Sequence, residues 1–225
     1  TFDAKTKNNP LEFAIKGMII HEIYWYWIMP NEKLYPEHKS LLNMFNSIYQ
    51  LNDEVQEAIA NESEIISVKK KTRLLNAGEA SNTIYFVNKG AARVYYLDKE
   101  GIEITSWFLF ENELLISVYS FFTGAPGFEY LETLEDCTFV ALKRDKLNKL
   151  YDKYLELNFI GRKLTEYYYI RNEKQANELR MFTAKQRYQE LLNTNPKLLN
   201  RVSLGYIASY LGISQETLSR IRKQI

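Results

Sequence analysis

Residues 203–225 read Ser-Leu-Gly-Tyr-Ile-Ala-Ser-Tyr-Leu-Gly-Ile-Ser-Gln-Glu-Thr-Leu-Ser-Arg-Ile-Arg-Lys-Gln-Ile. This stretch predicts two short helices joined by a tight turn. Ser203 and Ser214 stand where a side-chain oxygen can cap the start of each helix. Gly212 follows the first helix and can adopt the left-handed conformation that ends it. The pattern is typical of a helix-turn-helix, in which the second helix can enter the major groove of DNA.

The two faces of this helix pair differ in polarity. The inward face would be apolar and includes Ala208, which is small enough for two helices to cross closely. Its other members would be Tyr206 or Ile207, Leu211, Leu218 and Ile221. The outward face of the second helix is polar, and we expect base contacts from Gln215, Glu216, Thr217, Ser219 and Arg220. Arginine pairs with guanine and glutamine with adenine, and glutamate accepts a hydrogen bond from cytosine.

Charge is distributed unevenly along the chain. From Thr183 onward there are seven Lys and Arg residues against two acids, whereas the rest of the chain is slightly acidic. A basic segment on an acidic body indicates a polyanionic partner for that segment. We expect phosphate contacts from Lys185, Arg187, Arg201, Ser203, Ser214, Arg222 and Lys223. The alternatives are a solvated helical face and a helical hairpin without a ligand.

Upstream, residues 63–143 alternate short β-rich runs with turn signals. Period-two alternation is clear over residues 92–97, and Asp98-Lys99-Glu100-Gly101 predicts a hairpin turn. Several strands at this spacing predict a small barrel or jelly roll.

Residues 145–182 are rich in helix formers and lack proline. The apolar residues at helical spacing in this segment are Leu157, Ile160, Leu164, Tyr167 and Tyr168. Such a stripe needs a partner. It can pair with a second copy of the chain as a two-stranded coiled coil, or it can pack on its own barrel.

These motifs resemble the Crp–Fnr family of bacterial regulators over roughly residues 38–225. The resemblance is carried by Leu74-Leu75-Asn76-Ala77-Gly78-Glu79, residues 84–90, Arg93-Val94-Tyr95, Ile207-Ala208, Leu211-Gly212 and residues 214–220. The family's recognition helix commonly reads Ser-Arg-Glu-Thr-x-x-Arg. Glu216, Thr217 and Arg220 match this pattern, whereas Gln215 replaces an arginine and leaves its preferred base open.

The resemblance implies an α+β chain: a double-stranded, jelly-roll-like β-roll sensor, a long dimerisation helix and a C-terminal winged-helix-like helix-turn-helix domain. The corresponding boundaries are 1–37 for an N-terminal extension, 38–144 for the cyclic-nucleotide-binding-like β-roll, 145–182 for the helix and 183–225 for the DNA-binding domain. Expected partners are a palindromic double-stranded DNA site, a second copy of the chain and RNA polymerase.

The chain departs from the family where cyclic AMP would bind. Members that bind it carry Gly-Glu for the ribose and, some ten residues later, Arg-Ser-Ala for the cyclic phosphate. Those positions fall near Ser117-Val118 and Phe128-Glu129-Tyr130, and no Arg or Lys occurs between Lys99 and Lys143. A buried phosphate without a cation is costly. We therefore expect no cyclic AMP.

Other cofactors are also not expected. The single cysteine, Cys137, is too few for an iron–sulfur cluster. Neither that cysteine nor the two histidines matches a haem-ligand position, and the same side chains predict no metal site. An unknown effector could occupy an aromatic pocket, although these residues can equally be plain core. The pocket candidates are Tyr95, Phe108, Val118, Phe121, Phe128 and Tyr130.

Composition favours a globular cytoplasmic protein without disulfides. The most apolar run, Met18–Pro30, contains His21 and Glu22 and is too short to span a bilayer, so no membrane contact is expected. No paired His and carboxylate, phosphate-binding glycine loop or nucleophile motif is visible, so an enzyme is not expected. The alternative function is a small-ligand-binding or protein-interaction module whose helical tail docks on protein.

Overall fold

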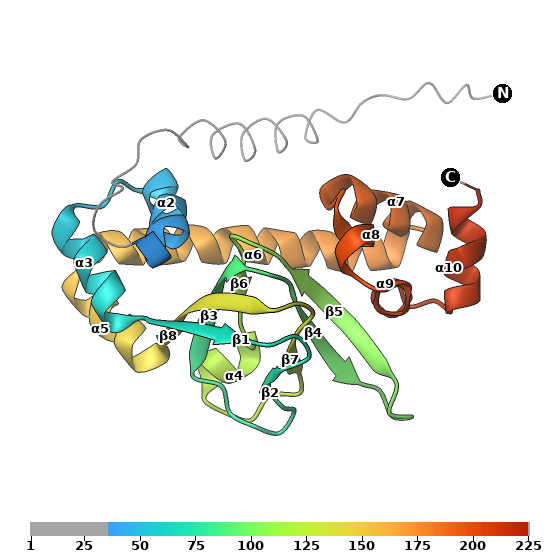
Figure 1. Cartoon of the computed structure of the whole chain (residues 1–225), viewed down its shortest axis with the longest axis horizontal. Coiled ribbons are helices and arrows are strands. Elements are labelled where there is room, and N and C mark those ends of the chain that lie inside the picture. Colours follow the sequence, from blue (N-terminus) through green and yellow to red (C-terminus); the bar gives the residue numbers. More distant parts are fainter. Residues whose placement is uncertain (1–35, 225) are drawn as a thin grey trace.

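The computed structural model of the chain describes residues 36–224 (Figure 1). The apolar run Met18–Pro30 and nearly all of the expected N-terminal extension lie outside the described residues. Before the long helix, the helical elements are η1 (Pro36–His38), α2 (Lys39–Ile48), α3 (Asp53–Glu62), α4 (Val118–Thr123) and α5 (Arg144–Lys153). The C-terminal helices are α6 (Leu155–Met181), α7 (Ala184–Thr194), α8 (Leu198–Arg201), α9 (Leu204–Leu211) and α10 (Gln215–Arg222).

The predicted β-roll is present as two four-stranded antiparallel sheets. One sheet has the order β1-β8-β3-β6 and the other β2-β7-β4-β5. The strands are β1 (Glu64–Val68), β2 (Arg73–Leu75), β3 (Thr83–Lys89), β4 (Ala92–Leu97), β5 (Glu103–Leu109), β6 (Leu114–Leu115), β7 (Tyr130–Thr133) and β8 (Cys137–Lys143). Residues from both sheets, including Val87, Leu131 and Phe139, fill the space between them.

The predicted hairpin between β4 and β5 is confirmed, because these strands pair antiparallel on either side of Asp98–Gly101. The Asp98 carboxylate accepts hydrogen bonds from the backbone N–H groups of Glu100 and Ile102. The simple alternation expected along β4 is not observed, because Ala92 to Tyr95 are all buried. Other side chains therefore cover the outer face of β4 as well as its inner face.

The predicted helix over residues 145–182 is two helices, α5 and α6, with a break at Tyr154, where the backbone is extended. α6 runs along the molecule and joins the β-roll end to the C-terminal helices (Figure 1). Leu157 and Ile160 are buried against the core formed with α2, α3 and α5. The Tyr168 hydroxyl accepts a hydrogen bond from the Leu114 N–H at 2.8 Å.

Of the two alternatives for the apolar stripe of α6, packing on its own β-roll is therefore observed over much of its length. Farther along α6, Arg171 pairs with Glu113 at 2.5 Å and Gln175 donates to the carbonyl of Ser106. The apolar side chains that α6 leaves exposed are Leu155, Phe159, Tyr167, Tyr169, Ile170, Leu179 and Met181. Only Tyr167 belongs to the predicted stripe.

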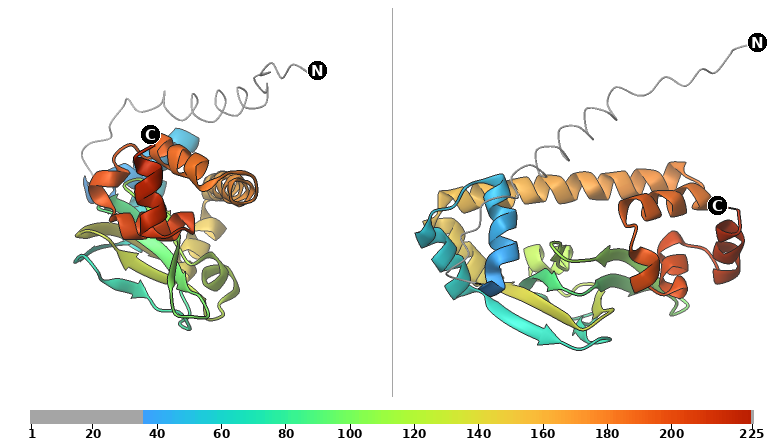
Figure 2. Two further views of the ribbon diagram at one scale, coloured as in Figure 1. Left: turned by 90° about the vertical axis from the view of Figure 1, so that its right-hand side faces the viewer. Right: turned by 45° about the horizontal axis from the view of Figure 1, so that its top comes forward.

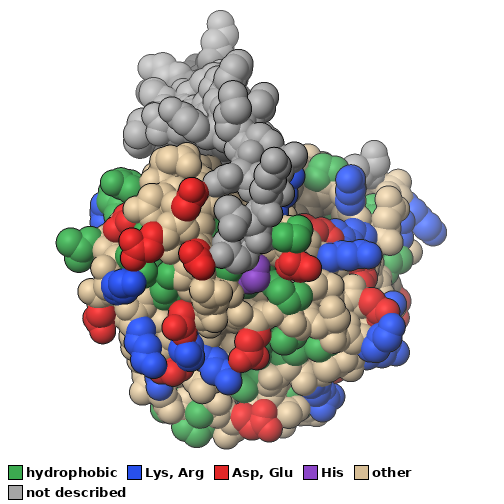
Figure 3. Space-filling view, turned by 60° about the vertical axis from the view of Figure 1, so that its left-hand side comes forward, with side chains coloured by type: hydrophobic (Ala, Val, Ile, Leu, Met, Phe, Trp, Pro, Cys, Tyr) green, Lys and Arg blue, Asp and Glu red, His purple; other side chains and the backbone are tan. Residues whose placement is uncertain are grey.

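The C-terminal helices lie at one end of the molecule beside β5, and α10 lies at the outermost edge (Figure 2). Residues 183–224 contain helices and no strand among the residues described, so the wing of the expected winged-helix-like domain is not present there. At the opposite end, acidic and basic side chains are interspersed on the surface near α3 and α5 (Figure 3). Among the described helices, none combines the length and apolar composition needed to cross a bilayer.

Candidate nucleic-acid interface

α9 and α10 form the two-helix unit that the sequence predicted. The Ser203 hydroxyl accepts a hydrogen bond from the Tyr206 N–H at 3.4 Å, and the Ser214 hydroxyl accepts one from the Thr217 N–H at 3.2 Å. Gly212 ends α9 with φ of +64°, a left-handed conformation that favours glycine. Both caps and the turn residue are therefore confirmed.

The inward face of this unit belongs to one apolar core. Ile207 and Leu211 are fully buried, and Leu218 and Ile221 of α10 pack into the same cluster as Tyr188 of α7. Ala208 is also buried, as expected for a close crossing of two helices. Of the two candidates for the first inward position, Ile207 is in this core, whereas Tyr206 is only half-buried and faces β4.

The outward face of α10 is open to solvent. Gln215, Glu216, Ser219 and Arg220 are exposed and Thr217 is half-buried. Arg220 donates to the Thr217 hydroxyl at 3.2 Å. A hydrogen bond from Ser214 lowers the pKa of Glu216, so this carboxyl stays charged at neutral pH. The five side chains expected to contact bases thus lie on one short helix at the end of the molecule.

The expected phosphate contacts divide into two groups. Ser203, Ser214, Arg222 and Lys223 are exposed, and Lys185 is half-buried with its ammonium group 3.4 Å from the carbonyl of Gln224. The two remaining residues, Arg187 and Arg201, are held by other groups of the protein.

Arg187 donates to the carbonyls of Phe182 and Leu211 at 2.7 and 2.8 Å. It therefore links the end of α6 to the end of α9. Arg201 forms ion pairs with Glu111 and Glu135, both in loops of the β-roll. Neither guanidinium is available to DNA in this conformation. The sequence-based assignments of Arg187 and Arg201 as phosphate contacts therefore do not fit this conformation of the protein.

The six candidate pocket residues are not gathered in one place. Tyr95 and Tyr130 stack with 4.9 Å between ring centroids, and Phe121 is buried. Phe108 instead packs on Tyr210 of α9, with ring centroids 5.4 Å apart.

The other two pocket candidates are exposed at the surface, Val118 to 51% and Phe128 to 70%. The expected aromatic pocket is therefore not formed by these six residues in the described conformation.

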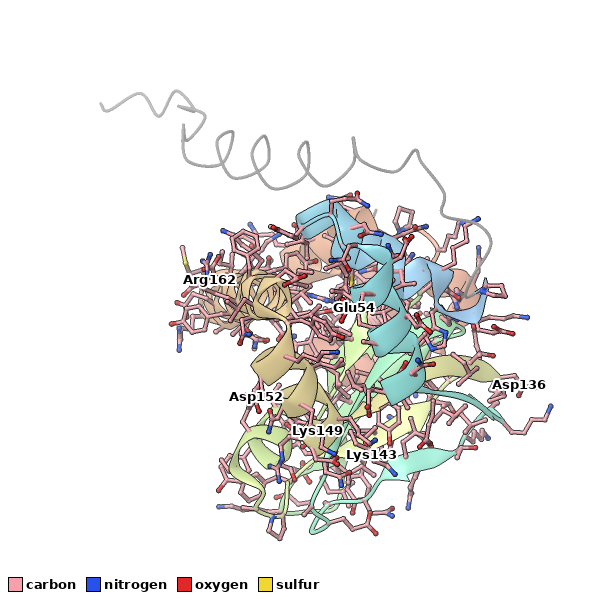
Figure 4. All side chains as sticks on the ribbon, turned by 90° about the vertical axis from the view of Figure 1, so that its left-hand side faces the viewer. Glu54, Asp136, Lys143, Lys149, Asp152 and Arg162 are labelled. Carbon is pink, nitrogen blue, oxygen red and sulfur yellow. The ribbon has the colours of Figure 1, made fainter. Side chains whose placement is uncertain are left out.

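A surface groove of about 330 Å³ lies elsewhere, between α3 and α5, and Glu54 and Lys149 line it from the two helices (Figure 4). Glu54 is 3.2 Å from Lys153, and Glu62 is 2.6 Å from Lys146. These charges are paired with one another across the two helices, so the groove gives no specific support to a small-molecule site.

Where cyclic-AMP-binding relatives carry their ligand motif, this chain has a short hydrogen bond. Ser117 is buried, and its hydroxyl donates to the Glu129 carboxylate at 2.5 Å. A Cβ added at Gly127 would lie 2.9 Å from the Ser117 oxygen, so the segment is closely packed. Arg144, just beyond this region in the sequence, donates to the carbonyl of Phe121 at 2.7 Å.

Known proteins share parts of this sequence and of this fold. Residues 65–154 match the family model described as Cyclic nucleotide-binding domain. FixK2 from Bradyrhizobium japonicum is similar in structure with a TM-score of 0.63 and 22% identity, over 72% of this chain and 83% of that one. A transcriptional regulator of the crp/fnr family from Eubacterium rectale gives a TM-score of 0.62 and 19% identity, over 77% and 83%. The chain has the Crp–Fnr fold.

The c-di-GMP-responsive global regulator CLP of Xanthomonas campestris shares the Crp–Fnr fold as well. It gives a TM-score of 0.61 at 18% identity, over 77% of this chain and 91% of that one. Comparison of the sequence with curated proteins finds no match. The resemblance to Crp–Fnr regulators that the motifs indicated is confirmed at the level of the fold.

Within this Crp–Fnr fold, sequence reasoning missed the contacts between the β-roll and the C-terminal helices. Arg93 had been noted only as part of a β-roll motif, yet its side chain is 1% exposed and lies between the rings of Tyr95 and Tyr206. An arginine inside a β-rich run was the available signal, because a buried guanidinium requires carboxylate partners. The sequence did not show which carboxylates these would be.

Proposed function

We propose that this chain is a sequence-specific DNA-binding transcription regulator that reads bases through α10. The observation that carries the proposal is the exposed polar face of a doubly capped, tightly turned helix pair. Gln215, Glu216 and Arg220 can each pair with a different base, and none of them is buried in the protein. The Crp–Fnr fold supports this use of α10, since the similar structures include transcription regulators.

Phosphate contacts would come from groups that surround α10 and are not held by the β-roll. These are Lys185, Ser203, Ser214, Arg222 and Lys223. The two serines start helices, where free backbone N–H groups favour an anion. Contacts of this kind position the protein on DNA without reading the sequence.

We propose that the functional form is a homodimer, as two copies would present two α10 helices to a palindromic site. The exposed apolar side chains of α6, among them Tyr167, Ile170 and Met181, support pairing through the face of α6 that points away from the β-roll. This face replaces the seam predicted from sequence. RNA polymerase is proposed as a further partner on the resemblance alone, and the cytoplasm is the expected location.

We also propose that the chain does not respond to cyclic AMP. The Glu129 carboxylate, hydrogen-bonded to Ser117, stands near the position where relatives place the arginine that neutralises the cyclic phosphate. A carboxylate there would repel a phosphate. An iron–sulfur cluster is not expected either, because Cys137 is the one cysteine of the chain. Haem is not expected because neither that cysteine nor the two histidines matches a haem-ligand position. We also propose that the chain acts as a regulator and not as an enzyme.

Selection of bound duplexes from a random DNA pool, followed by titration of the selected duplex at two salt concentrations, tests the proposal. We expect an enriched palindrome and an affinity that falls steeply with salt, because phosphate contacts release counterions. Lys149→Ala, on α5 at the end of the molecule opposite α10 (Figure 1), is a control that removes one exposed positive charge. Failure to enrich any duplex, with no binding even in dilute buffer, would contradict the proposal and favour docking of the helical tail on protein.

A further inference from the structure

The DNA-binding unit is attached to the β-roll by a set of polar contacts that we call the clasp: Arg93, Thr105, Glu111 and Glu135 of the β-roll with Arg201, Tyr206 and Ser209 of the C-terminal helices. Figure 2 shows the helices that carry the second group lying directly beside β5. The apolar residues Phe108 and Leu134 of the β-roll share a core with these helices.

Arg201 forms the charged part of the clasp. Its guanidinium donates to Glu111 at 2.7 and 2.8 Å and to Glu135 at 2.9 and 2.7 Å, a bidentate arrangement with each carboxylate. Hydrogen bonds to Glu135 and Glu111 raise the pKa of Arg201 above its ordinary value. Arg201 also lies over the Phe110 ring, 5.0 Å from its centroid. One cation and two carboxylates leave this group with a net negative charge.

Arg93 and Tyr206 form the second part. The Arg93 guanidinium pairs with Glu132 at 2.5 Å and with Glu103 at 2.6 Å. Its carbon lies 3.9 Å from the centroid of the Tyr95 ring and 3.8 Å from that of Tyr206, which reaches over from α9. The Tyr206 ring of α9 thus covers one side of the buried Arg93 guanidinium.

Ser209 forms the third part, on the next turn of α9. Its hydroxyl accepts a hydrogen bond from the Thr105 N–H at 2.9 Å and donates to the Glu103 carbonyl at 2.6 Å. The Thr105 hydroxyl lies 3.3 Å from it. The edge strand β5 therefore uses its own backbone groups to hold α9 in one position.

The clasp leaves the polar face of α10 exposed, but it holds Arg201 against two carboxylates, so that Arg201 cannot contact DNA beside that face. Arg201 stands two residues before Ser203, the cap of α9, whose N-terminal end is proposed to face a DNA phosphate. With the clasp closed, a phosphate near that helix end would meet the negative Arg201 group. With the clasp open, Arg201 can exchange its carboxylates for a phosphate, because a guanidinium binds both in the same bidentate way.

We infer that the clasp is a switch, and that closing it holds the DNA-binding unit in a form of low affinity for DNA. The inference rests on the proposed function and adds its regulation. Charge-assisted hydrogen bonds are present in both forms, so the two can lie close in free energy, as a switch requires. DNA, or an effector that separates β5 from α9, would shift the population to the open form.

A reversible disulfide tests the inference directly. The hydroxyls of Thr105 and Ser209 are in contact, so Thr105→Cys together with Ser209→Cys places two thiols where they can bridge β5 and α9. Cys137 is buried and remains outside this bridge. We expect the oxidised, locked protein to bind its selected duplex about 5- to 150-fold more weakly than the same protein after reduction, the usual range for coupling between sites.

The oxidised wild type is the control and should bind like the untreated wild type. The reduced double variant should bind at least as tightly as the wild type, because it lacks the Ser209 hydroxyl that joins α9 to β5. Equal affinity of the locked and reduced protein would overturn the inference while leaving the proposed function standing. Absence of DNA binding by the wild type itself would remove the proposed function, and the inference with it.

A second variant opens the clasp instead of locking it. Glu111→Gln with Glu135→Gln removes both carboxylate charges from Arg201 at nearly constant volume. Glu57→Gln with Glu100→Gln removes two exposed acidic charges elsewhere and is the matched control. We expect the first pair to bind DNA more tightly than the control pair, by at least about fivefold. Affinity at or below that of the control pair would contradict the switch.

Discussion

The Tyr206 ring of α9 lies over the guanidinium of Arg93 in β4, with 3.8 Å between the guanidinium carbon and the ring centroid. Tyr95 covers the opposite face of the same guanidinium at 3.9 Å. Burial lowers the pKa of Arg93, but hydrogen bonds to Glu132 and Glu103 outweigh this effect and raise it above its ordinary value. A buried charged group of the β-roll is therefore completed by a side chain from the C-terminal helices.

Replacing this ring should loosen the contact between the β-roll and α9. Tyr206→Leu removes a cation–π interaction with a desolvated guanidinium, and we expect a loss of about 2 kcal/mol in the free energy of unfolding. Tyr206→Phe keeps the ring and should lose much less. Denaturant unfolding of both variants measures the difference. An equal loss for both would show that the aromatic face does not stabilise the contact.

Two basic residues of the last helix should differ in what they do to DNA binding. Arg220→Ala should weaken binding to the selected duplex by about 1–3 kcal/mol and spare random duplex, because it removes a base contact. Lys223→Ala should weaken binding to all duplexes and reduce the salt slope by about 1. Titrations with selected and random duplex at several salt concentrations separate the two effects. If both variants left both affinities unchanged, the proposed roles would be wrong.

The core of the C-terminal helices should be sensitive to loss of volume. Leu218 is 1% exposed and packs among the residues of α7 and α9, so Leu218→Ala should destabilise the protein by about 2–5 kcal/mol. Ser219 is its exposed neighbour, and Ser219→Ala should change stability by less than about 0.5 kcal/mol. Thermal unfolding checks the pair. Similar Tm values for the two variants would contradict the packing described for α10.

Gly90 should be far less replaceable than Gly101, although both have positive φ. A Cβ at Gly90 would lie 2.6 Å from the Cys137 sulfur and 2.7 Å from the Asp136 carbonyl oxygen, whereas a Cβ at Gly101 would meet nothing within 4 Å. Gly101→Ala should therefore cost only the backbone strain, about 1–2 kcal/mol. Gly90→Ala should cost more, because backbone atoms must also move. Unfolding free energies of the two variants provide the test, and equal values would contradict it.

The Glu111–Arg201 contact predicts a pH dependence. Burial raises the pKa of Glu111, but hydrogen bonds from Arg201 and from the Gly90 N–H, together with the charge of Arg201, outweigh it. The pKa in the folded protein therefore lies below the ordinary value of 4.5. A lowered pKa stabilises the fold fully above the unfolded value, and this contribution is lost as the pH falls through the folded value.

Comparison of the wild type with Glu111→Gln over a pH series measures this contribution. The gap in unfolding free energy should be constant above about pH 5 and should narrow below it. Leu218→Ala, which removes no titratable group, should show no such narrowing. A gap that widens toward low pH would show that the carboxylate of Glu111 does not gain from Arg201 in the folded state.

The sequence by itself determined the features that depend on neighbouring residues. The caps at Ser203 and Ser214, the turn at Gly212 and the β4–β5 hairpin follow from hydrogen bonds and backbone preferences that act within a few positions. The polar face of α10 follows in the same way, because residues three or four positions apart lie on the same side of a helix. These features were predicted correctly from residues close together in the chain.

Tertiary structure decided which of two suitable partners each long side chain takes. Arg201 looked like a phosphate contact, and it pairs instead with carboxylates 66 and 90 positions away. The apolar stripe of α6 could have faced a second copy, but Leu157, Ile160 and Tyr168 pack on the chain's own β-roll. A buried charge or an apolar face requires a partner wherever it lies. The local sequence indicates that a partner is needed, but it does not identify which residue the partner is. Only the folded chain, by bringing distant segments together, selects among the groups that could meet it.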